Sequence, residues 1–594
     1  MNILLIQPPV RDFYQTAIRT QPLGLAYLAA ALIRQGHSAA ILDCQTPGLK
    51  QKIPTPCGFN YMQPAYQPGD ISPFRLYSSF YHYGISYERI KGTIRQHRPD
   101  AVGISCQFTP YYRETLQVAA LAKAFDPAIP VIIGGAHASA CPKEMLAHPD
   151  IDYVIIGEGE ESLPLLLQCL TSGSSPSAIP GLGWKKRAAV TINPRTTFIA
   201  DLDRLPLPAR ELLDHTQYTI DGNPYSMLLT SRGCPRKCTY CSVKTVMGTS
   251  LRLRSPQSII AEIRHCYDTY GISIYDIEDD NFTHDPLRAE EILTGIIREF
   301  GAGTIKLLAM NGLSIISLTD RLLAVMKKAG FQRLDLALGS SSPAVNKKMN
   351  RPADLKKTDA VLESARQTGF AYTTYILLGV PGHSLADMLA SIFYLAGKPS
   401  LIGPSIFYPS PGTQAFDDLA ATVRLPDYSF LRSSLFPVET DSFTRPDITT
   451  LLRLVRWINF AKQQLVPQDK DACAFSNISR HAPGWWPDDL PRTGPLPKHG
   501  RHYISFTAPP DPAKSGKILT ALLFRSNLFY GLRRLFPQNK ALYTYELFPY
   551  ITSAKVMQLF TAAADELVIR RAHAKKKITL SAALRQKESS DVSH

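Results

Sequence analysis

The stretch SRGCPRKCTYCSVKTVMG, residues 231 to 248, brings three cysteines, Cys234, Cys238 and Cys241, within eight positions. A structural zinc site needs four ligands in a tetrahedron, usually two pairs of Cys or His. The nearest further candidates, His265 and Cys266, lie about a helix away and form no second ligand pair. The three thiols therefore favour an iron–sulfur cluster in which one iron keeps an open position.

The length and composition limit the class of protein around this motif. A chain of 594 residues is too long for one hydrophobic core and predicts several domains. The N-terminus has no signal-peptide pattern, and no stretch approaches ~18 consecutive apolar residues, so we expect neither secretion nor membrane spanning. Ten cysteines are too few for a disulfide framework, and the tight triplet indicates metal chemistry in a reducing compartment, the cytoplasm.

Residues 1–170 alternate short apolar runs with helical patterns, which predicts a parallel sheet covered on both faces, a flavodoxin-like (Rossmann-type) domain. Ligands bind such sheets beyond the carboxyl ends of the strands. Glycines there let the backbone approach a bulky ligand, although glycine also serves turn geometry alone. The candidate ligand-binding residues at these ends are Pro8, Ser105, Gly134, Gly135, His137, Gly157 and Glu158.

Two further segments of this half lack a regular period. Residues 45–85 are rich in Pro, Tyr and Gly, and the alternatives are a functional loop that reaches over the active site and a packed surface excursion. Residues 171–215 are rich in Ser, Pro and Gly, which predicts a linker between domains.

Residues 216–425 contain six strand-like runs, each ending in a polar or glycine-containing turn, with five helical segments between them. This order predicts a partial (β/α)6 barrel of the TIM type, whose active site lies at the carboxyl ends of the strands. The first helix is predicted to begin at Ser255 and Pro256, to bury Ile259, Ile263, Tyr267 and Tyr270, and to stop at Gly271. The cysteine triplet follows the first strand and is expected at the mouth of the barrel.

The spacing Cys234-x-x-x-Cys238-x-x-Cys241, with the aromatic Tyr240 before the third cysteine, resembles the radical S-adenosylmethionine (SAM) enzymes. The resemblance implies a 4Fe-4S cluster held by the three thiolates, with the open iron chelating SAM. In that family an electron from the cluster cleaves SAM to a 5′-deoxyadenosyl radical, and the protein positions the radical and excludes water. It also implies an external electron donor of the flavodoxin or ferredoxin type.

The same resemblance suggests SAM contacts at the other strand ends, each of which has a structural turn as its alternative. Asp280 and its neighbours would accept hydrogen bonds from SAM, and a Gly-Pro-Gly turn would lie beneath the adenine. One departure is Gly339, where the family commonly has Glu. The residues concerned are Asp279, Asp280, Asn281, Asn311, Gly312, Ser340, Ser341, Ser342, Gly379, Pro381 and Gly382.

A flavodoxin-like domain ahead of such a barrel looks like the cobalamin-binding subclass of the family, over roughly residues 1–420. No Asp-x-His-x-x-Gly occurs in the first 170 residues, so cobalamin is expected without a histidine ligand, and His137 would contact a polar group of cobalamin rather than cobalt. The resemblance implies methylation of an unactivated carbon of a small-molecule or lipid substrate. The alternatives are a ring-forming or oxidative radical enzyme, an RNA methylthiotransferase, and a cobalamin-binding sensor or carrier without turnover.

Residues 426–594 match no pattern with a known role and are predicted to be basic and largely helical. The net charge is +15, and residues 514–577 alone hold twelve Lys or Arg against three Asp or Glu. This segment would either close the open side of the barrel or contact an anionic membrane surface. Nucleic acid is a third alternative, but methylthiolating relatives carry a second cysteine trio, whereas Cys44, Cys57, Cys106 and Cys141 are scattered singly.

Overall fold

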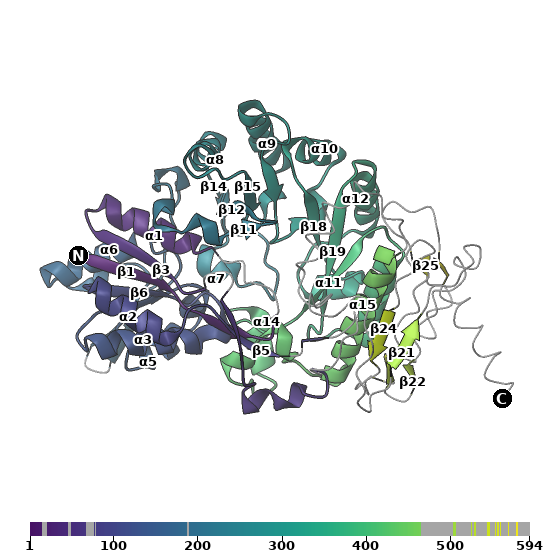
Figure 1. Cartoon of the computed structure of the whole chain (residues 1–594), viewed down its shortest axis with the longest axis horizontal. Coiled ribbons are helices and arrows are strands. Elements are labelled where there is room, and N and C mark those ends of the chain that lie inside the picture. The colour runs from purple at the N-terminus through teal and green to yellow at the C-terminus, as the bar shows by residue number, and fades with distance from the viewer. Residues whose placement is uncertain are drawn as a thin grey trace.

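The computed structural model describes most of the first 464 residues and short segments beyond residue 500 (Figure 1). The first domain lies at one end of the molecule, and the second domain follows it in the centre. The described residues are 1–14, 21–45, 49–66, 76–77, 79–186, 189–464, 503–506, 524–525, 528–529, 543–546, 553, 555–556, 559, 568–569 and 578–579.

The first domain contains a sheet with five parallel strands, and their order confirms the flavodoxin-like prediction. Taken in chain order, the strands are arranged 2-1-3-4-5 across the sheet, which is the doubly wound order of flavodoxin. The switch point lies between the first and third of these strands. The strands are β1 (Asn2–Gln7), β3 (Ser38–Asp43), β6 (Ala101–Ser105), β7 (Val131–Gly134) and β8 (Tyr153–Ile155).

Helices cover both faces of this sheet, because successive residues of its apolar strands point to opposite sides. Ile3 and Leu5 pack with helices α1 (Leu23–Arg34) and α6 (Ser162–Ser172). Leu4 and Ile6 pack on the other face with α2 (Tyr87–His97), α3 (Tyr112–Phe125) and α5 (Pro142–Ala147).

The predicted linker over residues 171–215 is partly a continuation of the sheet. Strands β9 (Leu182–Lys186) and β10 (Ala189–Ile192) form a hairpin, and β9 pairs antiparallel with β8. The Ser, Pro and Gly residues around them supply turns rather than an unstructured connector. The remainder, up to β11 (Thr219–Ile220), consists of turns and short 3-10 segments.

The 45–85 stretch carries regular structure that its composition did not predict. Its strands β4 (Lys50–Ile53) and β5 (Phe80–Tyr83) join β2 (Val10–Asp12) in a small antiparallel sheet, with a 3-10 helix, η1 (Cys57–Met62), between them. The buried rings of Phe59, Tyr66 and Phe80 belong to the same core as the second domain. The described part of this stretch is therefore packed and reaches the second domain.

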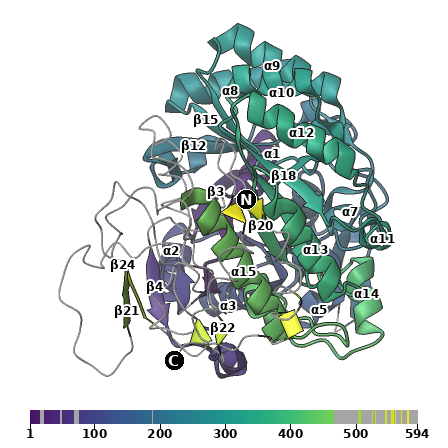
Figure 2. The same ribbon diagram turned by 90° about the vertical axis from the view of Figure 1, so that its right-hand side faces the viewer.

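All six strands and five helices predicted for the second domain are present, and the strands form two parallel sheets. Gly312 has a φ of +95° and ends the turn after β16. The chain changes direction there, and the short extra strand β17 (Leu313–Ser314) begins the second sheet. Figure 2 shows the helices along the outer side of the strands. The elements are β12 (Asn223–Leu228), α8 (Pro256–Tyr270), β15 (Ile274–Ile277), α9 (Pro286–Phe300), β16 (Lys306–Leu308), α10 (Asp320–Ala329), β18 (Arg333–Gly339), α12 (Leu355–Gln367), β19 (Ala371–Leu378), α13 (Leu385–Ala396) and β20 (Leu401–Ile406).

Helix α8 has the predicted ends but a different buried face. The Ser255 side chain accepts a hydrogen bond from the Ser258 backbone, and Gly271 ends the helix in the left-handed conformation. Cys266 is buried where we expected Tyr267, whose exposed fraction is 36%. The hydrophobic stripe is therefore shifted by one residue at the end of the helix.

The described part of residues 426–594 holds a helix, α15 (Arg445–Gln464), after α14 (Gln414–Ala420). It also holds short strand segments between residues 503 and 579, such as β21 (Tyr503–Phe506) and β24 (Tyr543–Glu546), which the prediction of a largely helical region did not include. Most of the basic 514–577 segment lies outside the described residues. In the described parts of the chain, no helix combines the length and apolar character needed to cross a bilayer.

Candidate functional site

The three cysteines lie on one loop at the carboxyl end of β12, as predicted. The loop runs from β13 (Ser231–Arg232) to α7 (Val243–Met247), and all three thiols are half-buried. Neighbouring segments fix its backbone: the Thr239 amide donates to the Met349 carbonyl at 3.1 Å, and the Thr239 carbonyl accepts from the Ala415 amide at 2.9 Å. The loop is therefore held in place by the protein itself.

The donor set of this loop suits an iron–sulfur cluster. Burial raises the pKa of Cys241 to about 11, so a thiolate at this position needs a bound cation to stabilise it. Among the described residues, no three His, Cys, Asp or Glu side chains converge on a point where a single metal ion would bind. A cluster spreads its thiolate ligands over several irons and does not require such convergence.

Tyr240 is tied to the end of β18 through Arg351. The Arg351 guanidinium donates to the Tyr240 hydroxyl at 2.7 Å and to the Ala337 carbonyl at 2.6 Å. Gly339, the position where Glu was expected, has φ of +87°, and a β-carbon there would lie 2.7 Å from Cδ of Arg351. Arg351 thus occupies the space that a side chain at residue 339 would need, which explains the departure from the family pattern.

The acidic turn after β15 divides into an internal and an accessible part. Asp279 is buried and accepts hydrogen bonds from the Thr230 amide at 2.6 Å and from the Ser231 hydroxyl, so it supports the start of the cysteine loop instead of facing a ligand. Asp280 is solvent-accessible, and desolvation by the surrounding protein raises its pKa to about 6. Asp280 is therefore the carboxylate of this turn that can meet a ligand.

Asn281 carries the clearest unsatisfied group beside the cysteines. Its side-chain nitrogen lies 3.9 Å from Sγ of Cys234, and its Oδ1 is buried without a hydrogen-bond partner among the described residues. Such orphaned buried acceptors are uncommon and point to a missing donor. An amide oxygen beside a cluster cysteine fits the ammonium group of SAM.

The remaining candidates at the strand ends differ in their exposure and in the hydrogen bonds that they already make. Asn311 is exposed, and its amide donates to the Glu278 carbonyl at 3.0 Å. Ser340 and Ser341 contact the Ser391 hydroxyl of α13 at 3.3 and 3.1 Å, so they join strand to helix. Ser342 begins α11 (Pro343–Lys348).

The predicted Gly-Pro-Gly turn follows β19. Gly379 and Gly382 have φ of +79° and +83°, Pro381 is partly exposed, and Gly382 is exposed. The sequence analysis missed the next residue, His383, whose two ring nitrogens are buried without partners among the described residues. Its place directly after the predicted turn was the only signal for it.

In the first domain, Ser105 and Gly134 lie at the carboxyl ends of neighbouring strands, as predicted, and both are partly exposed. A β-carbon on Gly134 would meet no atom within 4 Å, so the space directly beside this residue is open. Gly135 differs, because a β-carbon there would lie 2.8 Å from the Cys106 carbonyl. Pro8 is buried, and its carbonyl accepts from the Gln45 amide at 2.9 Å.

His137, in the short helix α4 (Ala136–Ala140), is buried, with an exposed fraction of 1%. Its ring packs between Tyr112 and Tyr428, at centroid distances of 5.6 and 5.1 Å, and Nδ1 lies 3.2 Å from the Thr109 hydroxyl. Burial lowers its pKa to about 4. The chain covers His137 instead of presenting it at the open edge.

Glu158 has another role than the predicted ligand contact. The structure places its buried carboxylate against Arg232 and Arg252, with nitrogen to oxygen distances of 2.9 and 2.7 Å. Gly157 has φ of +75°, and a β-carbon there would lie 3.2 Å from the Val246 carbonyl of α7. The first domain is thus packed against the cysteine loop at this point.

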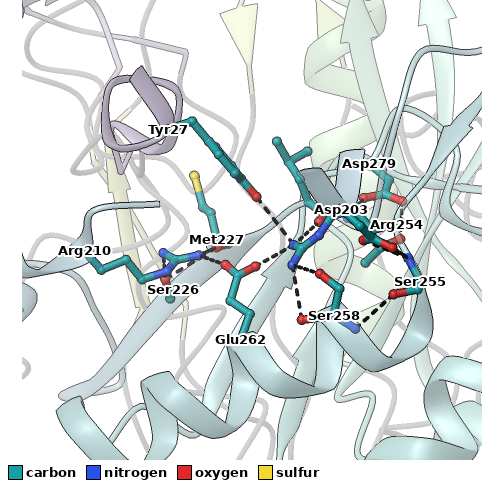
Figure 3. Close-up of polar contacts among 12 residues, drawn as sticks. Tyr27, Asp203, Arg210, Ser226, Met227, Arg254, Ser255, Ser258, Glu262 and Asp279 are labelled. Atoms are coloured by element: carbon teal, nitrogen blue, oxygen red, sulfur yellow. Dashed lines mark hydrogen bonds and ion pairs between the residues drawn. The ribbon is translucent and has the colours of Figure 1, made fainter. Parts of the chain in front are cut away.

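A second buried charge cluster lies at the root of the cysteine loop (Figure 3). Glu262 of α8 sits between the guanidinium groups of Arg210 and Arg254, at 2.6 and 2.5 Å. Arg210 also donates to the Met227 carbonyl of β12 at 2.8 Å. Sequence reasoning missed Arg210, Arg232, Arg252 and Arg254, because no local pattern distinguishes a buried Arg from an exposed one.

Comparisons with known proteins agree with this arrangement. Residues 78–167 match the family model of the B12 binding domain, and residues 228–395 match that of the Radical SAM superfamily. The chain is 29% identical to cytidylyl-2-hydroxyethylphosphonate methyltransferase of Streptomyces wedmorensis over 69% of this chain and 79% of that protein. It is 24% identical to hopanoid C-3 methylase of Methylococcus capsulatus over 72% and 74%.

Among solved structures, the fold resembles that of the radical S-adenosylmethionine methyltransferase TsrM from Kitasatospora setae, determined with cobalamin and a 4Fe-4S cluster bound. The TM-score is 0.54 at 16% identity, covering 71% of this chain and 78% of that chain. This likeness supports the order of the two domains and the fold of each.

Proposed function

This chain belongs to the cobalamin-dependent radical SAM enzymes, and from that premise we propose that it methylates an unactivated carbon of a small-molecule or lipid substrate. The observation that carries the proposal is the contact between the two domains. The carboxyl edge of the first domain packs on the loop that holds Cys234, Cys238 and Cys241. A methyl-carrying cofactor and a radical-generating cofactor held at these places would serve one substrate.

The bound cofactors supply a 5′-deoxyadenosyl radical from SAM and a methyl group carried by cobalamin. The three cysteine thiolates would hold the cluster, and Asn281 and Asp280 would accept hydrogen bonds from SAM. The partly exposed turn at Pro381 and Gly382 is our proposed adenine contact. Ser105 and Gly134, beside open space at the edge of the first sheet, would contact cobalamin.

The chain's own groups set the conditions for this chemistry. The protein around Asp280 holds its pKa near 6, so this carboxylate is largely ionised at neutral pH and can pair with an ammonium group. Arg351 fixes the hydroxyl of Tyr240, the residue just before Cys241, through a hydrogen bond of 2.7 Å. These residues would bind and orient SAM and would exclude water from the site.

We also propose a cytoplasmic location and an external one-electron donor of the flavodoxin or ferredoxin type. Thiol ligands need a reducing compartment, which supports the location. Contact of residues 514–577 with an anionic membrane remains part of the proposal, supported by their charge alone.

The test uses anaerobically purified, cluster-reconstituted protein with SAM, a strong reductant and hydroxocobalamin. We expect 5′-deoxyadenosine from radical cleavage and S-adenosylhomocysteine from methyl transfer, and the variant Cys238→Ala should lose the first product. Cys57→Ala, at an exposed cysteine, is the matched control and should keep both. Unchanged 5′-deoxyadenosine in Cys238→Ala would contradict the assignment of the cluster.

The first substrates to test are those named for the relatives, cytidylyl-2-hydroxyethylphosphonate and a hopanoid. A product heavier by one methyl group supports methylation. Oxidation or ring closure of a substrate, with 5′-deoxyadenosine but no S-adenosylhomocysteine, would replace methylation by the ring-forming alternative.

A further inference from the structure

The cysteine loop has a narrow root. Strands β13 and β14 (Arg252–Leu253) pair antiparallel, with Arg232 opposite Arg252, and they close residues 233–251 into one loop. The cysteines all lie inside this loop. A group that binds both Arg232 and Arg252 therefore fixes the position of the loop.

One carboxylate from the first domain holds both. Glu158 Oε1 accepts from Nη1 of Arg232 at 2.9 Å and from Nη1 of Arg252 at 2.7 Å, while Oε2 accepts from the Ile199 amide at 2.9 Å. Glu160 accepts from the other terminal nitrogen of Arg232 at 2.6 Å. All four charged side chains are buried.

The backbone of Glu158 is fixed in turn to the edge of the first sheet. The preceding Gly157 amide donates to the Ser139 hydroxyl of α4 at 2.9 Å. Nε of Arg195 donates to the Ile156 carbonyl at 2.8 Å, and its Nη2 donates to the Glu158 carbonyl. These hydrogen bonds fix the backbone of Glu158 in the loop that directly follows β8.

We propose that Glu158 is a positioning residue that fixes the cysteine loop against the cobalamin-binding edge and so couples the two cofactor sites. The proposal rests on the proposed function. Radical formation needs the cluster and SAM, both assigned to the second domain. Methyl transfer from SAM to cobalamin crosses the boundary between the domains, so it depends on their relative position.

The first test is hydrogen exchange of the cofactor-free full-length chain, which needs no turnover. In Glu158→Gln, peptides from residues 233–251 should exchange at least about tenfold faster, because the buried Arg252 loses its carboxylate partner and the buried Arg232 keeps only Glu160. Peptides from β6 and β7 should stay within about twofold of the wild type. Unchanged exchange of the loop, or equal acceleration of both regions, would overturn the proposal.

Three further variants separate the positioning of the cysteine loop by Glu158 from a general loss of stability. Glu161→Gln makes the same change at an exposed neighbour and should match the wild type. Arg252→Gln removes the other partner of the same ion pair and should also speed the exchange of the loop. Because the two partners act as a unit, the double variant should loosen it no more than Glu158→Gln alone.

The second test compares products at equal iron content per chain. The ratio of S-adenosylhomocysteine to 5′-deoxyadenosine should fall at least about fivefold in Glu158→Gln, with 5′-deoxyadenosine within about twofold of the wild type. An unchanged ratio at equal iron content would indicate a structural role only and refute coupling. If the wild type forms neither product, the proposed function fails, and the exchange test still decides whether Glu158 positions the loop.

Discussion

Replacing Glu262 by Gln is expected to loosen the root of the cysteine loop by a large, measurable amount. Glu262 is 1% exposed, and its two oxygens bind the guanidinium groups of Arg210 and Arg254 (Figure 3). Removing one member of a buried ion pair leaves an uncompensated charge and costs about 3–5 kcal/mol. Each arginine keeps a carbonyl acceptor, Met227 or Leu229, so we expect the lower part of that range.

The assay is hydrogen exchange of peptides from α8 and β12, because a multidomain chain has no single free energy of unfolding. At about 1.4 kcal/mol per factor of ten, a loss of about 3 kcal/mol speeds the slowest amides by roughly a hundredfold. Glu299→Gln is the matched control, since its ion pair with Arg264 is exposed and is worth at most about 1 kcal/mol. Exchange of α8 within about twofold of the wild type in Glu262→Gln would refute the reasoning.

The same cluster predicts a pH dependence. Burial acts to raise the pKa of Glu262, but Arg210 and Arg254 outweigh it and hold the pKa below its ordinary value. The ionised form is therefore favoured by folding, and its contribution is present above about pH 4.3 and lost as the pH falls below it. In Glu262→Gln that acid sensitivity of α8 exchange should disappear.

Two further predictions concern His137 and Gly339. Because burial lowers the pKa of His137 to about 4, the free energy of unfolding of the first domain should fall as the pH drops from 6.5, by up to about 1.4 kcal/mol per pH unit. His137→Phe should reduce this slope in thermal melts between pH 7.5 and 5, with the part due to the buried His383 remaining, whereas a variant of the exposed His97 should keep the slope in full. Gly339→Ala should lower the melting temperature more than Gly173→Ala, because both have positive φ but only Gly339 has Arg351 within 3 Å of the new β-carbon; equal shifts would contradict that steric argument.

The architecture was predictable because its signals are local. Each of the six strands of the second domain is a short apolar run followed by a glycine or polar turn, and α8 has both of its terminal residues, Ser255 and Gly271, where the sequence placed them. The cysteine loop was equally readable, since one loop carries all three thiols.

What the sequence did not decide depends on contacts that join distant segments. Glu158 was a reasonable ligand candidate near a strand end, but its carboxylate binds Arg232 and Arg252, which lie 74 and 94 positions further along the chain. The 45–85 stretch has no period of its own, and its Tyr61 finds its partner at the Leu435 carbonyl. No single-sequence pattern encodes such pairings, because each depends on the completed fold.

The two buried charge clusters also show how the cysteine loop is held. A buried ion pair contributes little net stability compared with apolar packing, because both charges lose their hydration. Its bonds are directional, however, and the arginine fork fixes orientation as well as distance. Glu262 holds Arg254, just beyond β14, from helix α8, and Glu158 holds Arg232 and Arg252 from the first domain. The position of the cysteines therefore follows both helix α8 of the second domain and the neighbouring first domain, as the proposed coupling of the two cofactor sites requires.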